Sequence, residues 1–175
     1  HYCIREAGRL GLGLGLTASS SWNAGGSWVT PEHANMALFP ADPLIVKGPG
    51  RFSDKLPFPS IPDKTPKGPD GMPVFYKEIA VIAYPYGGDT TDIEFASVKD
   101  ISSLLQKDGT LQWDIPEGEW AIVRFVCTNT GKMLHAPSLN SGGLVIDHFN
   151  PAATEMHFQT IIDRLHTEMG SLDNT

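Results

Sequence analysis

The order of apolar and polar positions divides the chain into an α/β segment, a long β segment and a second α/β segment. Residues 2–10 place apolar side chains on one helical face and charged ones on the other, and Gly11 is typical of a helix end. Residues 12–16 then alternate leucine with glycine, which predicts a short buried strand. A helix that leads directly into a buried strand is typical of parallel α/β folds.

A second α/β step is predicted near the other end of the chain. Residues 142–149 form a largely apolar run that includes Asp147, and such a run predicts a buried strand. Asn150 and Pro151 are residue types that commonly begin a helix, so we expect one over residues 152–169. The two outer segments supply only two parallel strands, so we expect the α/β part to be incomplete within this chain.

A loop and then a proline-rich stretch follow the first α/β step. Thr30 and Pro31 predict the start of a short helix over residues 33–38, with Glu32 in its first turn. Residues 40–73 hold so many prolines that we expect neither a helix nor a central strand there. A coil of this length is typical of a functional loop or of a crossing between domains.

From Val74 to about residue 137 the pattern becomes that of β structure. Strands are predicted at residues 75–84, 93–98, 111–115 and 120–128, with turns at 107–110 and 116–119. The last strand carries apolar side chains on both faces, which is typical of a central strand. Short strands separated by turn residues predict a small antiparallel domain similar to a β-sandwich.

The sequence thus predicts an α/β fold with a β insertion. We expect the first α/β segment over residues 1–39, the β-rich domain with its proline-rich lead-in over 40–141, and the second α/β segment over 142–175. A β domain inserted into a βα unit is the simplest account of this order.

Composition and charge limit the possible partners. The net charge is −7 and the chain has no run of lysine or arginine, so we expect no nucleic-acid partner. No apolar run reaches the roughly 18 residues that a membrane span needs. Cys3 and Cys127 are too few for a disulfide framework or a zinc site, and we expect two separate, packed thiols. The chain has no initiator methionine and opens inside a helical pattern, so we expect its true N-terminus to be missing, and the absence of a visible signal peptide carries no weight.

The loop after the first predicted strand carries residues suited to a sugar. Trp22 and Trp28 offer flat aromatic faces for the C–H groups of a pyranose, and Asn23 can bind its hydroxyl groups. Gly25 and Gly26 let the backbone come close to a ligand. Such a loop would lie at the C-terminal end of a strand, where active sites of parallel α/β barrels form. The alternative is that both tryptophans only anchor the loop.

Asp147 is the carboxylate best placed for chemistry, because it ends a predicted buried strand. Its alternative role is a hydrogen bond to a loop amide or to the start of the next helix, and His148 is expected to point to the opposite side. Glycoside hydrolysis needs two opposed carboxyl groups, and no such pair is evident in the α/β segments. The candidate substrate-binding residues are Trp22, Asn23, Gly25, Gly26, Trp28, Asp147 and His148.

Several stretches of the chain carry recognisable motifs, from Arg9-Leu10-Gly11 onwards. They lie within residues 8–16, 21–34, 75–83, 120–137 and 143–158. In this order they resemble the large α-L-rhamnosidase family of glycoside hydrolases, found mainly in gut and environmental bacteria, over nearly the whole chain. Ser27 replaces a common proline of that family, Val145 a common glutamate and His148 a common lysine. The last two lie beside the candidate site and leave the identity of the sugar open.

The resemblance implies a (β/α)8 catalytic barrel, of which residues 1–39 and 142–175 are parts, interrupted by the β-rich insertion. It implies inverting hydrolysis of terminal sugars of plant or microbial polysaccharides, a calcium ion, and a periplasmic or extracellular location. The catalytic glutamates would follow Thr175, and the remainder of the polypeptide would be this segment's partner. The alternatives are a non-catalytic carbohydrate-binding β-sandwich module, and a related glycosidase or polysaccharide lyase with another sugar preference.

Overall fold

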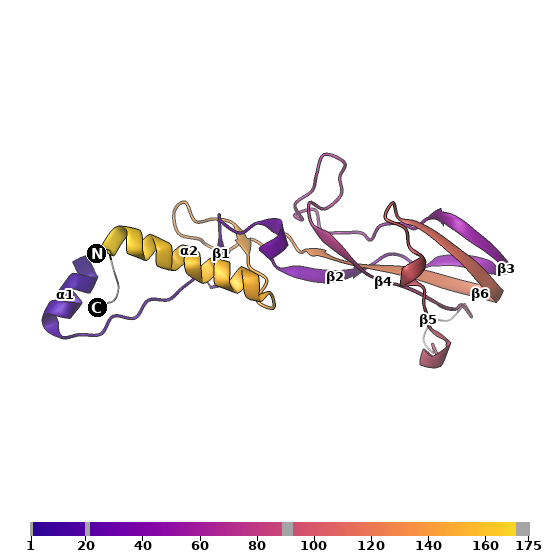
Figure 1. The fold of residues 1–175 in the computed structure, drawn as a ribbon, viewed down its shortest axis with the longest axis horizontal. Helices are drawn as coiled ribbons and strands as arrows, with labels where there is room; N and C mark the ends of the chain where they lie inside the picture. Colours follow the sequence, from indigo (N-terminus) through magenta and orange to yellow (C-terminus); the bar gives the residue numbers. More distant parts are fainter. Residues whose placement is uncertain (1, 20–21, 89–92, 171–175) are drawn as a thin grey trace. The chain divides into compact units, whose positions relative to one another are not determined.

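The computed structural model of the protein describes residues 2–19, 22–88 and 93–170 (Figure 1). The chain divides into two compact units. Met36–Thr130 forms the first, which we call the sheet unit, and His1–Asn35 together with Gly131–Thr175 forms the second, which we call the flanking unit. The sheet unit is continuous in sequence, and the flanking unit is made of the residues before it and after it in sequence.

One antiparallel sheet of five strands makes up the sheet unit (Figure 1). The strands are β2 (Met36–Pro40), β3 (Leu44–Lys55), β4 (Tyr76–Pro85), β5 (Lys99–Asp100) and β6 (Thr110–Asn129). The long strand β6 pairs with β2 and β3 along one edge and with β4 along the other, and β5 pairs with β4. The central position expected for residues 120–128 is therefore confirmed.

Apolar side chains pack on both faces of this sheet, which explains why β6 is apolar throughout its second half. The larger cluster contains Leu56, Val81, Ala83, Ile101, Leu111, Trp113, Ile115, Trp120 and Ile122. A smaller cluster contains Tyr84, Ala121 and Val123. Within the sheet unit the described residues form one sheet, so the expected sandwich-like domain is corrected to one sheet that carries a core on each side.

The prediction of a turn at residues 116–119 is wrong, because β6 runs through these residues without a break and contains a β-bulge there. Gly48 pairs with Gly118, but the next pair along the ladder is Gly50 with Ile115, so β6 holds one extra residue. An extra residue reverses the alternation of side chains between the two faces. The residues of the larger core cluster accordingly are odd-numbered before the bulge and even-numbered after it: Leu111, Trp113 and Ile115, then Trp120 and Ile122.

Strands β2 and β3 replace the helix expected at residues 33–38 and the first part of the coil expected at 40–73, whereas residues 56–73 are irregular as expected. Pro40 is the last residue of β2, and the next two prolines lie where the ladder is open. Pro43 lies between the two strands, and Pro49 lies at the register shift opposite the bulge. Proline is tolerated in sheets at edge strands and bulges, and β2 and β3 share one edge of β6. Counting prolines without knowing which edge they face therefore gave the wrong prediction.

Two shorter segments also differ from the sequence prediction. The strand expected at residues 93–98 is a 3₁₀ turn at Phe95–Ser97, and Ser102–Leu104 forms another. Thr30 and Pro31 do begin a helical turn, but it is the short 3₁₀ turn Pro31–His33, after which the chain extends into β2. Isolated turns of this kind carry no periodic signal that a sequence could reveal.

The flanking unit contains both described helices, α1 (Tyr2–Leu10) and α2 (Pro151–Met169), and both predictions are confirmed. Helix α1 ends at Gly11, whose φ of 66° is the left-handed conformation that favours glycine. Helix α2 begins at Asn150, whose side chain accepts a hydrogen bond from the Ala152 amide at 3.0 Å. Neither helix is long and apolar enough to cross a membrane.

Residues 12–16 form no strand, which corrects the prediction of a buried barrel strand. Leu12, Leu14 and Leu16 are each more than half exposed. A strand needs a neighbour to accept its backbone hydrogen bonds, and the described residues bring none to this segment. In the flanking unit, the strands are two-residue segments, β1 (Gly25–Gly26) and β7 (Leu144–Val145), which pair antiparallel rather than parallel. Cys3 lies exposed on α1 rather than packed.

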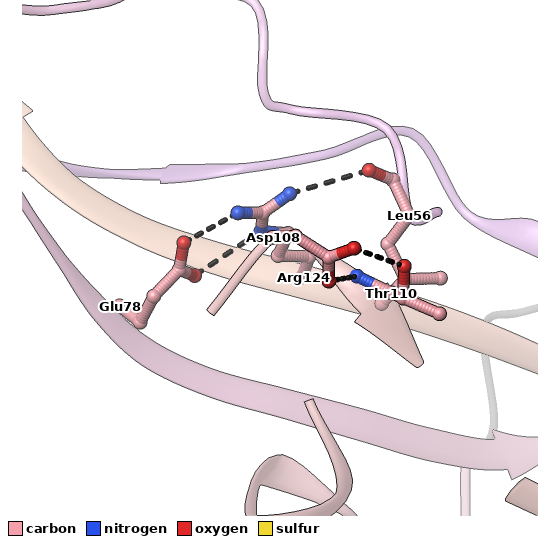
Figure 2. Close-up of polar contacts among 5 residues, drawn as sticks. All are labelled: Leu56, Glu78, Asp108, Thr110 and Arg124. Carbon is pink, nitrogen blue, oxygen red and sulfur yellow. Dashed lines mark hydrogen bonds and ion pairs between the residues drawn. The ribbon is translucent and has the colours of Figure 1, made fainter. Parts of the chain in front are cut away.

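A buried arginine joins β6 to β4 in the sheet unit (Figure 2). The Arg124 guanidinium forms an ion pair with Glu78, donates to the Leu56 carbonyl at 3.2 Å, and stacks over Phe58 at 5.2 Å. The Arg124 side chain is 7% exposed and that of Glu78 is 36% exposed. The pair is thus unequal, because water reaches the carboxylate much more easily than the guanidinium.

The turn before β6 is held by Asp108, also shown in Figure 2. Its carboxylate accepts hydrogen bonds from the Thr110 amide and the Thr110 hydroxyl, each at 3.0 Å. These bonds favour the charged form and hold the pKa of Asp108 below its usual value. The turn expected at residues 107–110 is confirmed.

We expect the two partners of the buried ion pair to respond unequally to substitution. Glu78→Ala leaves the buried guanidinium without its carboxylate and should destabilise the chain by about 3 kcal/mol. Arg124→Met leaves a carboxylate that water can solvate, and should cost about 1–2 kcal/mol. Urea unfolding followed by tryptophan fluorescence measures both. Equal costs, or a larger cost for Arg124→Met, would contradict the role assigned to burial.

Candidate functional site

Residues 144–147 are the backbone around which the candidate site is built. On one side β1 pairs with β7, and the Ile146 amide donates to the Ala24 carbonyl at 3.1 Å. On the other side the Asn35 amide donates to Val145, and the Asp147 amide donates to His33, both at 2.8 Å. The structure therefore brings together the two segments that the sequence singled out, the tryptophan loop and the segment ending at Asp147.

The glycines of the loop allow this close backbone contact. A Cβ atom on Gly25 would lie 2.4 Å from the Leu144 carbonyl oxygen, and one on Gly143 would lie 2.0 Å from the Gly26 carbonyl oxygen. A Cβ atom on Gly26 would lie 2.4 Å from the Trp28 ring. Gly25 and Gly26 are buried, so the atoms they approach belong to the protein itself. Their contact with a ligand stays a prediction.

Trp28 packs into the flanking unit. Its ring lies against the cluster of Val29, Ala34, Ile146 and Ala153. The ring centroid lies 5.7 Å from that of His157 on α2, with an interplanar angle of 30°, and the Arg164 guanidinium lies 4.6 Å from it. The Trp28 Nε1 atom is buried, and the structure gives it no hydrogen-bond partner. This environment is that of a loop anchor.

Trp22 has a different environment, because it is 89% exposed. The contact that the structure gives its ring is with His135, edge-on at a centroid distance of 6.1 Å and an interplanar angle of 74°. The neighbouring Asn23 is partly buried, and its carbonyl lies 3.4 Å from the Ser19 hydroxyl. Ser21, part of the same predicted loop, lies outside the described residues. Trp22 thus offers the largest open aromatic surface of the loop.

Asp147 takes up the structural role that the sequence left open as an alternative. Its carboxylate accepts a hydrogen bond from the Phe149 amide at 3.0 Å, which shapes the turn into α2. Asp147 is partly buried, His148 is exposed and Phe149 is 97% exposed. A contact of Asp147 or His148 with substrate stays a prediction, and it would use the carboxylate oxygen that does not bond Phe149.

The described residues do not contain a metal site of ordinary composition. No group of three or more His, Cys, Asp or Glu side chains comes together among residues 2–19, 22–88 and 93–170. Calcium is also held by backbone and amide carbonyl oxygens, and its binding by the complete protein stays a prediction.

Two residues of the site were missed by the sequence analysis. His135 contacts Trp22, and His157 contacts both Trp28 and the Ala18 carbonyl. His157 and Ala18 are 139 positions apart, so no local pattern could link them. The available sequence signal was that His157 and Phe158 belong to the last of the family-like motifs, within residues 143–158.

Comparison with known proteins decides the family. A sequence profile of glycoside hydrolase family 106, described as alpha-L-rhamnosidase, matches residues 72–174. That range is more than half of the 175 residues and runs from before β4 to beyond α2. The chain belongs to the alpha-L-rhamnosidase family. The resemblance read from the sequence motifs is thereby confirmed.

A curated relative of this rhamnosidase-family chain is a protein of Formosa agariphila named "Putative beta-glucuronidase". The two are 28% identical over 205 residues, which cover 100% of this chain and 17% of the relative. The chain therefore spans about a sixth of that protein's length.

A solved structure, that of a rhamnosidase from Novosphingobium sp. PP1Y, has a similar fold. The TM-score is 0.73 over 97% of this chain and 31% of the solved one, at 15% sequence identity. The arrangement of the described helices and strands thus recurs in a longer rhamnosidase.

We expect Gly26→Ala to disrupt the candidate site, because the new methyl group would collide with the Trp28 ring. Overpacking of this kind costs about 1–3 kcal/mol. The matched control is Gly8→Ala on α1, where a Cβ atom would meet nothing within 4 Å. Alanine also favours the helix more than glycine does. Thermal unfolding should show a lower melting temperature for Gly26→Ala only. An unchanged melting temperature would mean that β1 and β7 are not tightly paired.

Proposed function

We propose that the chain is part of a glycoside hydrolase of the α-L-rhamnosidase type and supplies one wall of its sugar-binding site. Membership of the alpha-L-rhamnosidase family carries this proposal. That membership favours an enzyme segment over a stand-alone carbohydrate-binding module.

Trp22 is the residue that we propose for stacking against the sugar. An indole that is 89% exposed leaves most of its apolar surface in water, and a pyranose can cover that surface with its C–H groups. Asn23 and Asp147 supply polar groups on the adjoining segments, which the pairing of β1 with β7 holds together. Trp28 supports this arrangement by packing against the cluster that contains Ile146 and Ala153.

The sugar that we propose is a terminal α-L-rhamnosyl residue of a plant or microbial polysaccharide, by analogy with the family. The named activity of the relative from Formosa agariphila makes a β-glucuronoside the second candidate. Paired assays with nitrophenyl α-L-rhamnoside and nitrophenyl β-D-glucuronide on the enzyme that carries this chain test the choice directly. The proposal would be overturned if the enzyme hydrolysed neither compound.

The catalytic carboxylates are proposed to lie on strands after Thr175, in a barrel that this segment helps to build. Inverting hydrolysis needs two carboxyl groups on opposite sides of the glycosidic bond, with room for a water molecule. Calcium is likewise proposed to bind outside the described residues. A periplasmic or extracellular location would suit an enzyme that acts on polysaccharides.

The isolated 175-residue chain is expected to show no glycosidase turnover. Among the described residues of the flanking unit, Glu32 lies exposed on a short turn and Asp147 is committed to the Phe149 amide. Neither faces an evident partner carboxylate. Rhamnoside hydrolysis by the purified chain that is abolished by Asp147→Asn would contradict this expectation.

We expect substitution of Trp22 and of Trp28 in the complete enzyme to have different effects. Trp22→Ala should lower kcat/KM by roughly ten- to hundredfold, because stacking on an aromatic ring is worth about 1–3 kcal/mol, and should leave the melting temperature unchanged. Trp28→Ala removes a packed ring and should destabilise the protein by about 3 kcal/mol. Melting temperature and kcat/KM are measured together. Normal kcat/KM for Trp22→Ala would remove Trp22 from the sugar site.

A further inference from the structure

The buried side chain of His157 contacts the chain on both sides of the exposed Trp22. His157 lies on α2 and is 1% exposed. Its Nε2 atom lies 3.0 Å from the carbonyl oxygen of Ala18, before Trp22 in sequence. Its ring lies against Trp28, after Trp22, at a centroid distance of 5.7 Å. One side chain therefore fixes the two positions from which the Trp22 segment starts and ends.

The contact with Ala18 determines that the Nε2 atom of the His157 ring carries a proton. A carbonyl oxygen only accepts hydrogen bonds, so the His157 Nε2 atom must carry the proton and donate it. In the neutral ring Nδ1 is then a bare acceptor, and the structure gives this buried atom no partner. The bond to Ala18 alone sets which edge of the ring faces the loop.

A histidine is a poor choice at this position if packing is its only task. Both Nδ1 of His157 and Nε1 of Trp28 are buried without a hydrogen-bond partner, and such atoms oppose folding because they have lost their bonds to water. A phenylalanine at this position would present no polar atom without a partner against Trp28. Sequences depart from the rules of stable packing mainly at functional sites, and here the gain is the bond that reaches Ala18.

We propose that His157 is a positioning residue for sugar binding, which acts by holding the backbone at Ala18 and the ring of Trp28 so that Trp22 faces the substrate. This inference rests on the proposed function, because it assigns the effect of His157 to the stacking surface of Trp22. His157 itself does not contact the sugar. Its removal changes how well substrate binds and leaves the chemical step unchanged.

Three variants of the complete enzyme separate the bond to Ala18 from packing. His157→Phe keeps a ring against Trp28 but leaves the Ala18 carbonyl without its donor. His157→Gln places an amide N–H where Nε2 was and can restore that bond, whereas His157→Asn places its amide near Nδ1 and falls short of Ala18. His166→Gln, an exposed histidine on the same helix, serves as the control.

The kinetic expectation concerns KM and kcat for nitrophenyl α-L-rhamnoside, or for the β-D-glucuronide if that is the compound turned over. His157→Phe and His157→Asn should raise KM by roughly three- to tenfold, less than complete loss of the stacked ring, with kcat within about twofold. His157→Gln and His166→Gln should keep the original KM. If His157→Phe does not fold, the Gln and Asn pair decides the question.

A double-variant cycle tests whether His157 acts through Trp22. In a Trp22→Ala background, His157→Phe should raise KM no further, because the surface it positions is already gone. An unchanged KM in His157→Phe or His157→Asn, or an equal further rise in the Trp22→Ala background, overturns the inference. The proposed function fails separately, if the complete enzyme turns over neither nitrophenyl glycoside.

Discussion

The candidate site depends on a backbone contact from which side chains are excluded. Gly25 and Gly26 lie so close to residues 143–145 that a single added carbon at any of three glycines would meet a backbone or ring atom. This contact holds the tryptophan loop beside the segment that ends at Asp147. Because the loop is anchored here, Trp28 turns inward against α2 and Trp22 remains exposed. Glycine thus acts in this loop by permitting close packing of the chain on itself.

The sheet unit solves a different problem, that of keeping a twenty-residue strand in register with three neighbours. The extra residue of the β6 bulge lets one strand place Trp113 and Trp120 on the same face, where their rings meet edge-to-face at 5.6 Å. Arg124 then brings charge into this core, and its carboxylate partner comes from the neighbouring strand β4. Register, bulge and ion pair are consistent only with one alignment of β4, β6 and β3.

The sequence predicted the elements whose signals are local. Helix α2 carries its own start signal at Asn150, and the second half of β6 carries apolar residues on both faces. The prolines of β2 and β3 misled the prediction, because their effect depends on which edge of a sheet they face. The core-facing side chains of β6 are odd-numbered before the bulge and even-numbered after it. The sequence pattern therefore predicted two strands where the structure has one.

The candidate site was predictable in part for the same physical reason. Trp22, Trp28 and Asp147 stood out by residue type, and the structure places their segments side by side. The different environments of Trp22 and Trp28 follow from contacts with α2 that span most of the chain, and these leave no trace in a local pattern. Residues 12–16 have the composition of a strand, but composition cannot supply the neighbour that a strand requires.

The two ends of the sheet unit lie next to each other, since Met36 at its start pairs with Asn129 near its end. The chain therefore leaves the flanking unit and returns to it through adjacent, hydrogen-bonded strands. Insertions are tolerated best where entry and exit are close, because the host fold then needs no rearrangement to accommodate the guest. With its entry and exit side by side, the sheet unit could be lengthened or replaced without moving the points at which the flanking unit joins it.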